Sequence, residues 1–414
     1  MKHVSPLSAS PVQHERSRSI WRQVLTALLL VLVGYNIRAV VLAVPPVLPL
    51  IQHDLALTYA LAGLLTALPV LMLGSVAWLS GLLVERIGPR TCVTLGLVLL
   101  AAGTLLRAFW PNTLALFLFT VVLSLGIVMA QTAAPVLTRL WFPAQIGMVA
   151  ALFTDGLIIG ESAGAGLTVP FMQRFLGPDN WAGTFIFWGV PIVLLLLLWL
   201  WLAPAAPALH RRAAEQTETP LEEVGGEKRP RVNSLHLGVM LGAGSLIYFG
   251  MNGWIASYNL ALHRESWTPL ALVVLNAAQL PASLALTFVA QRLAGSRWPF
   301  IGAGIVCGLS ILGWFATPAP FEVLWAALLG ASSALVFTLG IALPPLLARP
   351  GEVGRLTGIT VSLTYAVAFV GPFLGGALWD LFALPLVAFV PVIGASLILI
   401  VLGALLPARS AFGL

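Results

Sequence analysis

Three ionisable residues, Arg38, Asp155 and Glu161, lie in stretches of sequence that are otherwise apolar. Insertion scales put one charge at the centre of a membrane span at roughly 2.5–3.5 kcal/mol, so such residues persist where they face water, pair or bind something. An arginine offers a fixed planar set of donors to an anionic or polar ligand. A poorly solvated carboxylate can take up and release a proton. These side chains predict substrate binding at Arg38 and proton coupling at Asp155 or Glu161.

The positions of Arg38 and Glu161 predict that both lie at a similar depth. Arg38 follows Arg22 by 16 residues and Glu161 follows Gln145 by 16 residues, where Arg22 and Gln145 mark the starts of the two helices. At about 1.5 Å per residue, each side chain lies about 24 Å along its helix. Equal depth allows an ion pair between Arg38 and Glu161 provided that the two helices are neighbours. Such a pair could bind a solute, or it could only brace the two helices.

Asp155 and Glu161 are expected to point in different directions. They are six residues apart, which separates them by about 120° around a helix. On the same helix Gly156, Gly160 and Gly164 form a ridge of small residues, and such a ridge lets a neighbouring helix approach closely. The two carboxylates flank this ridge on opposite sides, so we expect them to do different jobs.

Further polar side chains in the apolar stretches are candidates for lining a central cavity. The candidates for substrate binding besides Arg38 are Tyr35, Asn36, Gln131, Tyr248, Asn252, Gln279 and Tyr365. Tyr258 and Asn276 belong to the same group. Polar groups in membrane helices also bind neighbouring helices, so about half of these residues are expected to face the cavity.

The sequence lacks the motifs of common catalytic and metal sites. It contains no HExxH pair, no nucleophile elbow and no Walker loop for nucleotide phosphates. Cys92 and Cys307 lie in apolar segments, and the six histidines lie in tails, loops or span ends. We therefore expect no enzyme activity, no cofactor and no metal.

Membrane-spanning helices must position these side chains. Of the 414 residues, 59% are hydrophobic and only 9% are charged, whereas soluble domains carry about 25% charged residues. A span needs about 20 mostly apolar residues, and a helix satisfies its own backbone hydrogen bonds in lipid. The sequence predicts an all-α membrane protein with twelve transmembrane helices, at residues 22–50, 59–83, 91–110, 113–138, 146–172, 181–203, 236–260, 269–292, 298–317, 321–347, 356–379 and 384–406.

The basic residues predict the orientation of these spans. With the N-terminus inside, all 21 Lys and Arg residues except Arg38, Arg107, Arg174 and Arg264 fall on the cytoplasmic side. Cytoplasmic loops favour Lys and Arg, so both termini are expected in the cytoplasm. The net charge of +6 therefore needs no nucleic-acid partner.

A polar stretch divides the chain into two related halves. The predicted units are a cytoplasmic tail (1–21), a six-helix bundle (22–203), a cytoplasmic linker (204–234), a second six-helix bundle (235–407) and a cytoplasmic tail (408–414). Residues 134–139 resemble residues 344–349, which indicates a weak internal repeat. Two pseudo-symmetric bundles around a central cavity are typical of transporters with a binding site near the midplane.

A ten-residue segment after the second predicted span carries a recognisable pattern. The segment GLLVERIGPR at residues 81–90 resembles G-x-L-x-D-R-x-G-x-R, the loop signature of the major facilitator superfamily, with Glu in place of the usual Asp. The resemblance implies a major facilitator fold, in which the first and fifth spans are near neighbours, so an ion pair between Arg38 and Glu161 is expected. It also implies a conformational latch that involves Gly81, Glu85, Arg86, Gly88 and Arg90. We expect the carboxylate and the arginines to pair in one state and to separate in the other.

Other motifs resemble the cyanate porter branch of that superfamily, which includes bacterial cyanate and 2-nitroimidazole transporters. In chain order they are NIR at 36–38, PP at 45–46, AGLLTALPV at 62–70, WFP at 141–143, AGLTVP at 165–170, QLPA at 279–282 and GPFLGG at 371–376, followed by Asp380. Ala39 stands where this branch usually has proline, which leaves the local helix shape and the substrate open.

The resemblance and the missing nucleotide site together imply a secondary active transporter. It is expected to move a small polar or anionic solute, cyanate-like or nitroimidazole-like, by alternating access and with protons as the coupling ion. We expect it to work as a monomer in the lipid bilayer, as a symporter or an antiporter. One alternative is a proton-driven drug or metabolite exporter on the same fold. A second, from another class, is a non-transporting membrane sensor that signals through residues 204–234.

Overall fold

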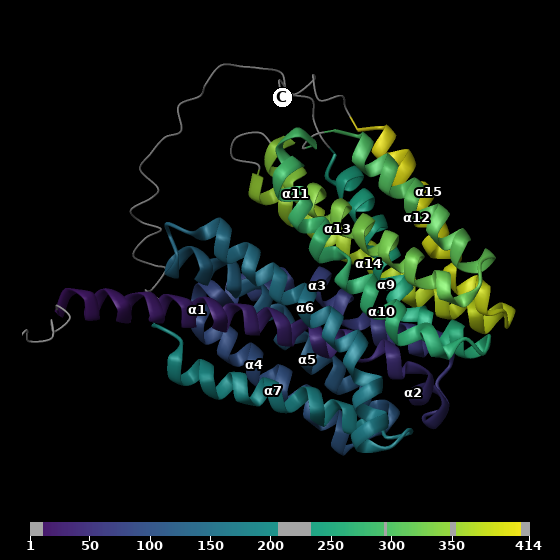
Figure 1. Ribbon diagram of the computed structural model, residues 1–414, viewed down its shortest axis with the longest axis horizontal. Helices are drawn as coiled ribbons and strands as arrows, with labels where there is room; N and C mark the ends of the chain where they lie inside the picture. The colour runs from purple at the N-terminus through teal and green to yellow at the C-terminus, as the bar shows by residue number, and fades with distance from the viewer. Residues whose placement is uncertain (1–10, 206–232, 294–295, 348–352, 407–414) are drawn as a thin grey trace, which may run out of the picture.

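Helices that run between two sides of the molecule make up the protein (Figure 1). The structure is a computed structural model that describes residues 11–205, 233–293, 296–347 and 353–406. Within these ranges, twelve helical spans are long and apolar enough to cross a membrane. The expected all-α fold with twelve transmembrane helices is therefore confirmed. We call the side at which α7 (Trp181–Leu202) ends and α9 (Ser234–Ala261) begins the linker side, and the opposite side the far side.

The first half of the chain forms six spans, drawn from purple to teal in Figure 1. Besides α7, its helices are α1 (Pro11–Leu42), α2 (Leu48–Asp54), α3 (Tyr59–Ile87), α4 (Pro89–Phe109), α5 (Thr113–Trp141) and α6 (Ile146–Phe171). A π-helical turn, η2 (Met172–Leu176), continues α6 on the far side.

The second half forms the other six spans, drawn in green and yellow. After α9 come α10 (Thr268–Ala277), α11 (Gln279–Leu293), α12 (Trp298–Ala316), α13 (Glu322–Leu347), α14 (Val353–Phe382) and α15 (Val390–Ala404). Short 3-10 turns precede three of these helices on the far side, namely η3 (Glu265–Trp267), η4 (Ala319–Phe321) and η5 (Pro385–Phe389).

Proline divides the first span, which the sequence predicts as a single helix over 22–50. α1 ends at Leu42, and a 3-10 turn, η1 (Pro45–Val47), leads into α2. Pro45 and Pro46 lack the amide hydrogens that a continuing helix would need. The chain therefore changes direction on the far side, before the span is complete.

A second break divides the eighth span, between α10 and α11 at Ala278. The ring of Pro281 would clash with the carbonyl group of Ala277, four residues earlier, in an unbroken helix. The break places Gln279 at the start of a new helix. Broken helices are a common way to present polar groups at a transporter's binding site.

The latch segment 81–90 is mostly helical, although the sequence predicts that the second span ends at residue 83. α3 continues to Ile87 and α4 begins at Pro89, so Gly88 alone separates them. Gly88 has φ of +83°, a left-handed conformation that glycine adopts without a steric penalty. The predicted end at residue 83 is wrong, because the helix continues past the charged residues Glu85 and Arg86. It ends only at Gly88, where the positive φ breaks it.

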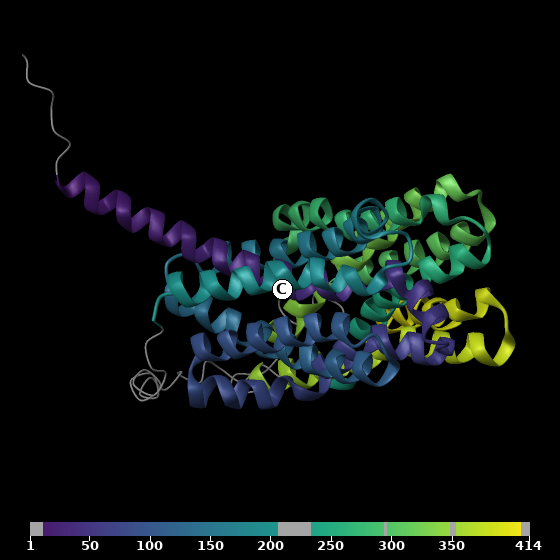
Figure 2. The same cartoon turned by 90° about the horizontal axis from the view of Figure 1, so that it is seen from below.

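The predicted tails and linker lie largely outside the described residues. The tail at 408–414 and nearly all of the linker at 204–234 belong to this part. The N-terminal tail was expected to extend to residue 21, but α1 already begins at Pro11. Figure 2 shows the first turns of α1 extending beyond the other helices.

Close packing of α1 against α6 holds the first half together. A Cβ atom added to Gly156, Gly160 or Gly164 would lie 2.4, 2.2 or 2.3 Å from a backbone oxygen of α1. Only glycine fits at such an approach, so the expected ridge of small residues is confirmed. The same packing brings Arg38, near the far-side end of α1, beside Glu161 on α6.

The two halves contact each other mainly on the far side. Asp380 of α14 accepts hydrogen bonds from the backbone amides of Tyr59 and Ala60, at 2.8 and 2.7 Å. The rings of Tyr59 and Trp379 stack, with their centroids 4.1 Å apart. A Cβ atom on Gly63 would lie 2.2 Å from a backbone oxygen of α14. Helices α3 and α14 are thus closely packed at this end.

The halves separate toward the linker side. Along α3, the close approach to α14 continues as far as Gly74, whereas Trp78, one turn further on, is 64% exposed. In Figure 1 the linker-side ends of the first half point to the left and those of the second half point upward. The described conformation is therefore closed on the far side and open on the linker side.

Candidate substrate site

A cavity of about 80 Å³ lies at the boundary between the two halves. Its lining comes from α1 and α6 of the first half and from α9, α11, α13 and α14 of the second half. A water molecule needs roughly 10–15 Å³ by the same measure. The cavity therefore has room for several water molecules or for a solute of a few heavy atoms.

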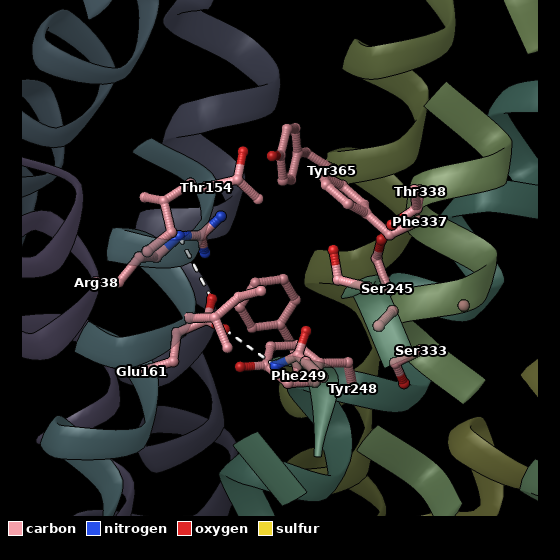
Figure 3. Close-up of a pocket in the computed structure, with 16 residues that line it drawn as sticks. Arg38, Thr154, Glu161, Ser245, Tyr248, Phe249, Ser333, Phe337, Thr338 and Tyr365 are labelled. Atoms are coloured by element: carbon pink, nitrogen blue, oxygen red, sulfur yellow. Dashed lines mark hydrogen bonds and ion pairs between the residues drawn. The ribbon is translucent and has the colours of Figure 1, made fainter. Parts of the chain in front are cut away.

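Arg38 and Glu161 form an ion pair at the wall of this cavity (Figure 3). Nε of Arg38 lies 3.5 Å from Oε1 of Glu161, and the two side chains are 9% and 7% exposed. Charge-assisted N–H···O bonds are normally about 2.7–2.9 Å long, and the buried Nε donates no hydrogen bond within the described chain. The pair is therefore loose, and the guanidinium group keeps donors that a ligand can use.

Glu161 also binds across the boundary between the halves. Its Oε2 accepts a hydrogen bond of 3.1 Å from Nε2 of Gln279 on α11, which Figure 3 marks with a dashed line. The hydroxyl group of Tyr248 faces Glu161 and Gln279, and that of Tyr365 faces Arg38. Residues of both halves thus surround one carboxylate and one guanidinium group.

Two buried asparagines support this group from behind. Tyr248 donates a hydrogen bond to Oδ1 of Asn276, and Nδ2 of Asn276 donates to Oδ1 of Asn252 at 2.9 Å. Asn252 and Asn276 are 1% and 0% exposed. Asn252, a predicted substrate contact, therefore lies behind Tyr248 and outside the cavity lining.

The rest of the cavity wall consists of neutral residues that were not among the candidates from sequence. They are Thr154, Leu157, Ile158, Gly244, Ser245, Phe249, Ser283, Ser333, Ala334, Phe337 and Thr338. Ser and Thr in membrane helices commonly bond to the carbonyl group four residues earlier, as Thr154 does. Their residue type therefore carries no signal of a cavity position, and only the packing of α6, α9, α11 and α13 reveals it.

Besides Asn252, four predicted site residues lie away from the cavity lining. Tyr35 points toward α7, with its ring 6.4 Å from that of Trp188. Nδ2 of Asn36 donates to the carbonyl oxygen of Leu32. Gln131 on α5 has a buried Oε1 with no partner among the described residues. Asp155 is half-buried and does not line the cavity.

Tyr258, predicted as a further cavity candidate, lies on the far side of the second half. Its ring packs against Phe315 and Phe389, with centroids 5.5 and 5.2 Å away. It contributes to an aromatic cluster in the core and not to the cavity lining.

The latch residues lie at the linker-side ends of α3 and α4. Glu85 and Arg86 are exposed, and Glu85 has no ion pair with any residue that the structure describes. Arg90 contacts the carbonyl oxygen of Leu200 at 3.4 Å. A Cβ atom on Gly81 would meet nothing within 4 Å. In this conformation the carboxylate of the latch segment forms no ion pair within the described part of the chain.

Buried charges also occur outside the group formed by Arg38, Asp155 and Glu161, the only ones expected from the sequence. Glu322 at the start of α13 is 0% exposed, accepts a hydrogen bond of 2.7 Å from Asn259, and lies 3.7 Å from Arg264. Arg107, expected outside the membrane, is 1% exposed and stacks over Phe185. Glu322 and Arg107 lie at the ends of predicted spans, where sequence alone does not tell a buried side chain from a solvated one.

Solved structures of transporters resemble this fold. A mutant form of the nucleoside transporter NupG superposes with a TM-score of 0.72 at 12% identity, covering 92% of this chain and 99% of that chain. The xylose transporter XylE from E. coli, in an inward open conformation, gives a TM-score of 0.68 at 15% identity, covering 90% and 94%. At these identities the likeness concerns the fold alone.

Curated relatives match most of the chain. The cyanate transport protein CynX of Escherichia coli (strain K12) is 28% identical over 358 residues, which cover 85% of this chain and 89% of that protein. The 2-nitroimidazole transporter of the same organism is 25% identical over 353 residues, which cover 85% and 87%. These similarities confirm the resemblance to the cyanate porter branch.

A sequence profile extends this assignment from single relatives to a family. The family model described as Major Facilitator Superfamily matches residues 24–294. This range covers nearly all of the first half, and it extends into the second half beyond Gln279. With this match, the twelve spans and the transporter relatives together, the chain belongs to the major facilitator superfamily of membrane transporters.

Proposed function

We propose that the protein moves a small polar or anionic solute, cyanate-like or nitroimidazole-like, across the cytoplasmic membrane of a bacterium by alternating access. The observation that carries this proposal is the cavity between the halves, which holds one guanidinium group and one carboxylate in an otherwise neutral wall. Sites of this kind, at the interface of two repeats, are typical of secondary transporters. The names of two curated relatives, a cyanate transport protein and a 2-nitroimidazole transporter, support small solutes of these two kinds.

The proposed orientation has both termini and the linker in the cytoplasm. The distribution of Lys and Arg supports it, because cytoplasmic loops are enriched in these residues. With this orientation, a cavity that is closed on the far side faces the cytoplasm. The described conformation then corresponds to the inward-facing state of the transport cycle.

The charged groups of the cavity and three polar side chains beside them have proposed roles. Arg38 binds the solute through its free donors, and Gln279, Tyr248 and Tyr365 complete the binding site. Glu161 takes up and releases the coupling proton, since it is the carboxylate in contact with Arg38. Asp155, on the same helix but outside the cavity lining, is the less favoured of the two acids. Every group in this scheme comes from a single chain, which supports a working monomer.

The latch segment has a proposed role in switching between states. In the described conformation Glu85 and Arg86 are exposed at the open side. Closing this side would bring the latch segment toward the second half, where its carboxylate and arginines find partners. The latch would then stabilise the opposite, outward-facing state.

Transport by the purified protein in lipid vesicles tests the proposal. Uptake of cyanate, 2-nitroimidazole and formate would be measured with and without an imposed proton gradient. We expect uptake of at least one solute to rise several-fold with the gradient and to be lost in Arg38→Ala. Uptake that is equal in vesicles with and without protein, for all three solutes, would refute the proposal.

A second candidate is export of a flat, neutral heteroaromatic compound on the same fold. Phe249 and Phe337 line the cavity, and aromatic rings stack favourably on flat solutes. One curated relative is a 2-nitroimidazole transporter. If vesicles with the opposite gradient moved 2-nitroimidazole while cyanate and formate stayed behind, export would be the better description.

A further inference from the structure

The charges around the cavity balance within the described residues. Arg38 supplies the one positive charge of the lining and Glu161 the one negative charge, while every other lining side chain is uncharged at neutral pH. The empty site therefore has a net charge of zero. A monovalent anion that simply joined this pair would place two negative charges against one guanidinium group.

The carboxylate of Glu161 occupies the position that an anionic solute would need. It bridges Nε of Arg38 at 3.5 Å and Nε2 of Gln279 at 3.1 Å, with the hydroxyl groups of Tyr248 and Tyr365 nearby. The two donors in contact with the carboxylate come from α1 and α11, one in each half. An anion cannot use them while the carboxylate holds them.

We propose that Glu161 is the resident anion of this site and that a small monovalent anion displaces it from Arg38, with one proton bound to Glu161 for each anion bound. The inference rests on the proposed function and adds its stoichiometry and its substrate class. The proton comes from the surrounding water and returns to it when the anion leaves. The loaded site then has the same net charge as the empty site, so the transport of anion and proton together is electroneutral.

Desolvation is the physical reason for this exchange. Glu161 is 5% exposed, and no second cation faces it among the described residues: α1 presents Arg38, α9 presents Tyr248, α11 presents Gln279, and α14 presents Tyr365. Once an anion takes Arg38, a charged carboxylate would remain buried without a partner, which is costly. Protonation removes that charge and leaves a hydroxyl group that can still donate a hydrogen bond.

The same balance selects the substrate by charge. A monoanion plus one proton restores neutrality, whereas a dianion would leave one uncompensated negative charge in a buried site. The cavity of about 80 Å³ adds a limit on size. The site should therefore accept cyanate, formate or acetate and reject dianions such as oxalate at neutral pH.

Proton uptake on binding is the direct test. Formate would be added to the full-length protein in detergent, in a weakly buffered solution with a pH indicator, and binding would be followed by calorimetry. We expect close to one proton taken up per formate bound, so the affinity for formate should fall about tenfold per pH unit wherever a full proton is taken up. Formate binding without proton uptake would overturn the proposal.

Variants assign the proton to a residue. Glu161→Gln should bind formate without proton uptake and with the same affinity at every pH, because no carboxylate competes for Arg38. Asp179→Asn, on an exposed far-side turn, should keep the wild-type uptake of protons. If Asp155→Asn abolished proton uptake and Glu161→Gln retained it, the proposed exchange would be wrong. The number of protons that the wild type takes up per formate bound tests the proposed exchange even if Glu161→Gln does not fold.

Transport in vesicles tests electroneutrality separately. Formate uptake driven by a pH gradient should not change when the membrane potential is clamped at zero or at an inside-negative value. A several-fold dependence on potential would contradict one proton per anion. If no solute crossed the membrane at all, the proposed function would fail, while proton uptake on formate binding would still report on the exchange at Glu161.

Discussion

Asp380 at the far-side end of α14 caps α3 of the other half, since its Oδ1 accepts a hydrogen bond of 2.8 Å from the backbone amide of Tyr59. Its Oδ2 accepts a second bond of 2.7 Å from Ala60. The first amides of a helix have no partner within the helix and form the positive end of its dipole. A carboxylate of one half thus closes the far side by capping a helix of the other half.

Replacing Asp380 with alanine should weaken closure of the far side. Hydrogen bonds to a charged group contribute about 1.5–3 kcal/mol each, so the population open on the far side should rise about tenfold or more. Spin labels at Phe175 and Leu381, exposed far-side residues of opposite halves, would report the distance between the halves. Asp179→Asn, a far-side acid with no such contact, serves as the control. An unchanged distance distribution would show that Asp380 does not hold this side closed.

Replacing Arg38 with lysine should weaken solute binding while the protein still folds. Lysine keeps the charge but lacks the planar fork of donors, and the loss of one charge-assisted hydrogen bond corresponds to about a tenfold to hundredfold weaker affinity. Binding of cyanate or formate by calorimetry would measure this. Arg174→Lys, at an exposed far-side position, should bind as the wild type does. If both variants bound the solute as tightly as the wild type, Arg38 would not be a binding residue.

Replacing Gly160 with alanine should destabilise the first half. The new Cβ atom would lie 2.2 Å from the carbonyl oxygen of Tyr35, so α1 and α6 must move apart. Overpacking of this kind costs about 1–3 kcal/mol, measurable as a lower unfolding temperature in detergent. Gly147→Ala is a matched control on the same helix, because its Cβ atom meets nothing within 4 Å. A destabilisation of the same size in both variants would mean that the close approach is not the cause.

Replacing Glu85 with glutamine should slow transport without weakening binding in the described conformation. Glu85 is exposed and lies outside the cavity lining, so affinity for the solute should stay about the same as in the wild type. If its charge stabilises the opposite state, the maximal transport rate should fall several-fold. Glu85→Asp, which restores the usual residue of the family signature, should keep the rate. A parallel loss of affinity and rate would point to a role at the binding site.

The sequence by itself determined the architecture and the charged centre of the site. Twelve long apolar stretches predict transmembrane helices, because in lipid each helix forms all of its backbone hydrogen bonds internally. The glycine ridge on α6 and the equal depths of Arg38 and Glu161 follow from residue spacing within single helices, which the sequence shows directly. Spacing gave the two residues equal depth, the resemblance to the major facilitator superfamily made the two helices neighbours, and the structure contains the expected pair.

Only the tertiary structure decided how residues of the second half contribute to the cavity. Gln279 meets Glu161 because Pro281 breaks the eighth span and because the two halves dock at the far side. Asn252 supports Tyr248 through Asn276 and stays out of the cavity, which no spacing within one helix could show. Contacts between halves depend on the relative placement of helices far apart in sequence. For this reason, the sequence identified the charged residues and the polar side chains Tyr248, Gln279 and Tyr365, whereas only the tertiary structure identified the other neutral residues of the cavity wall.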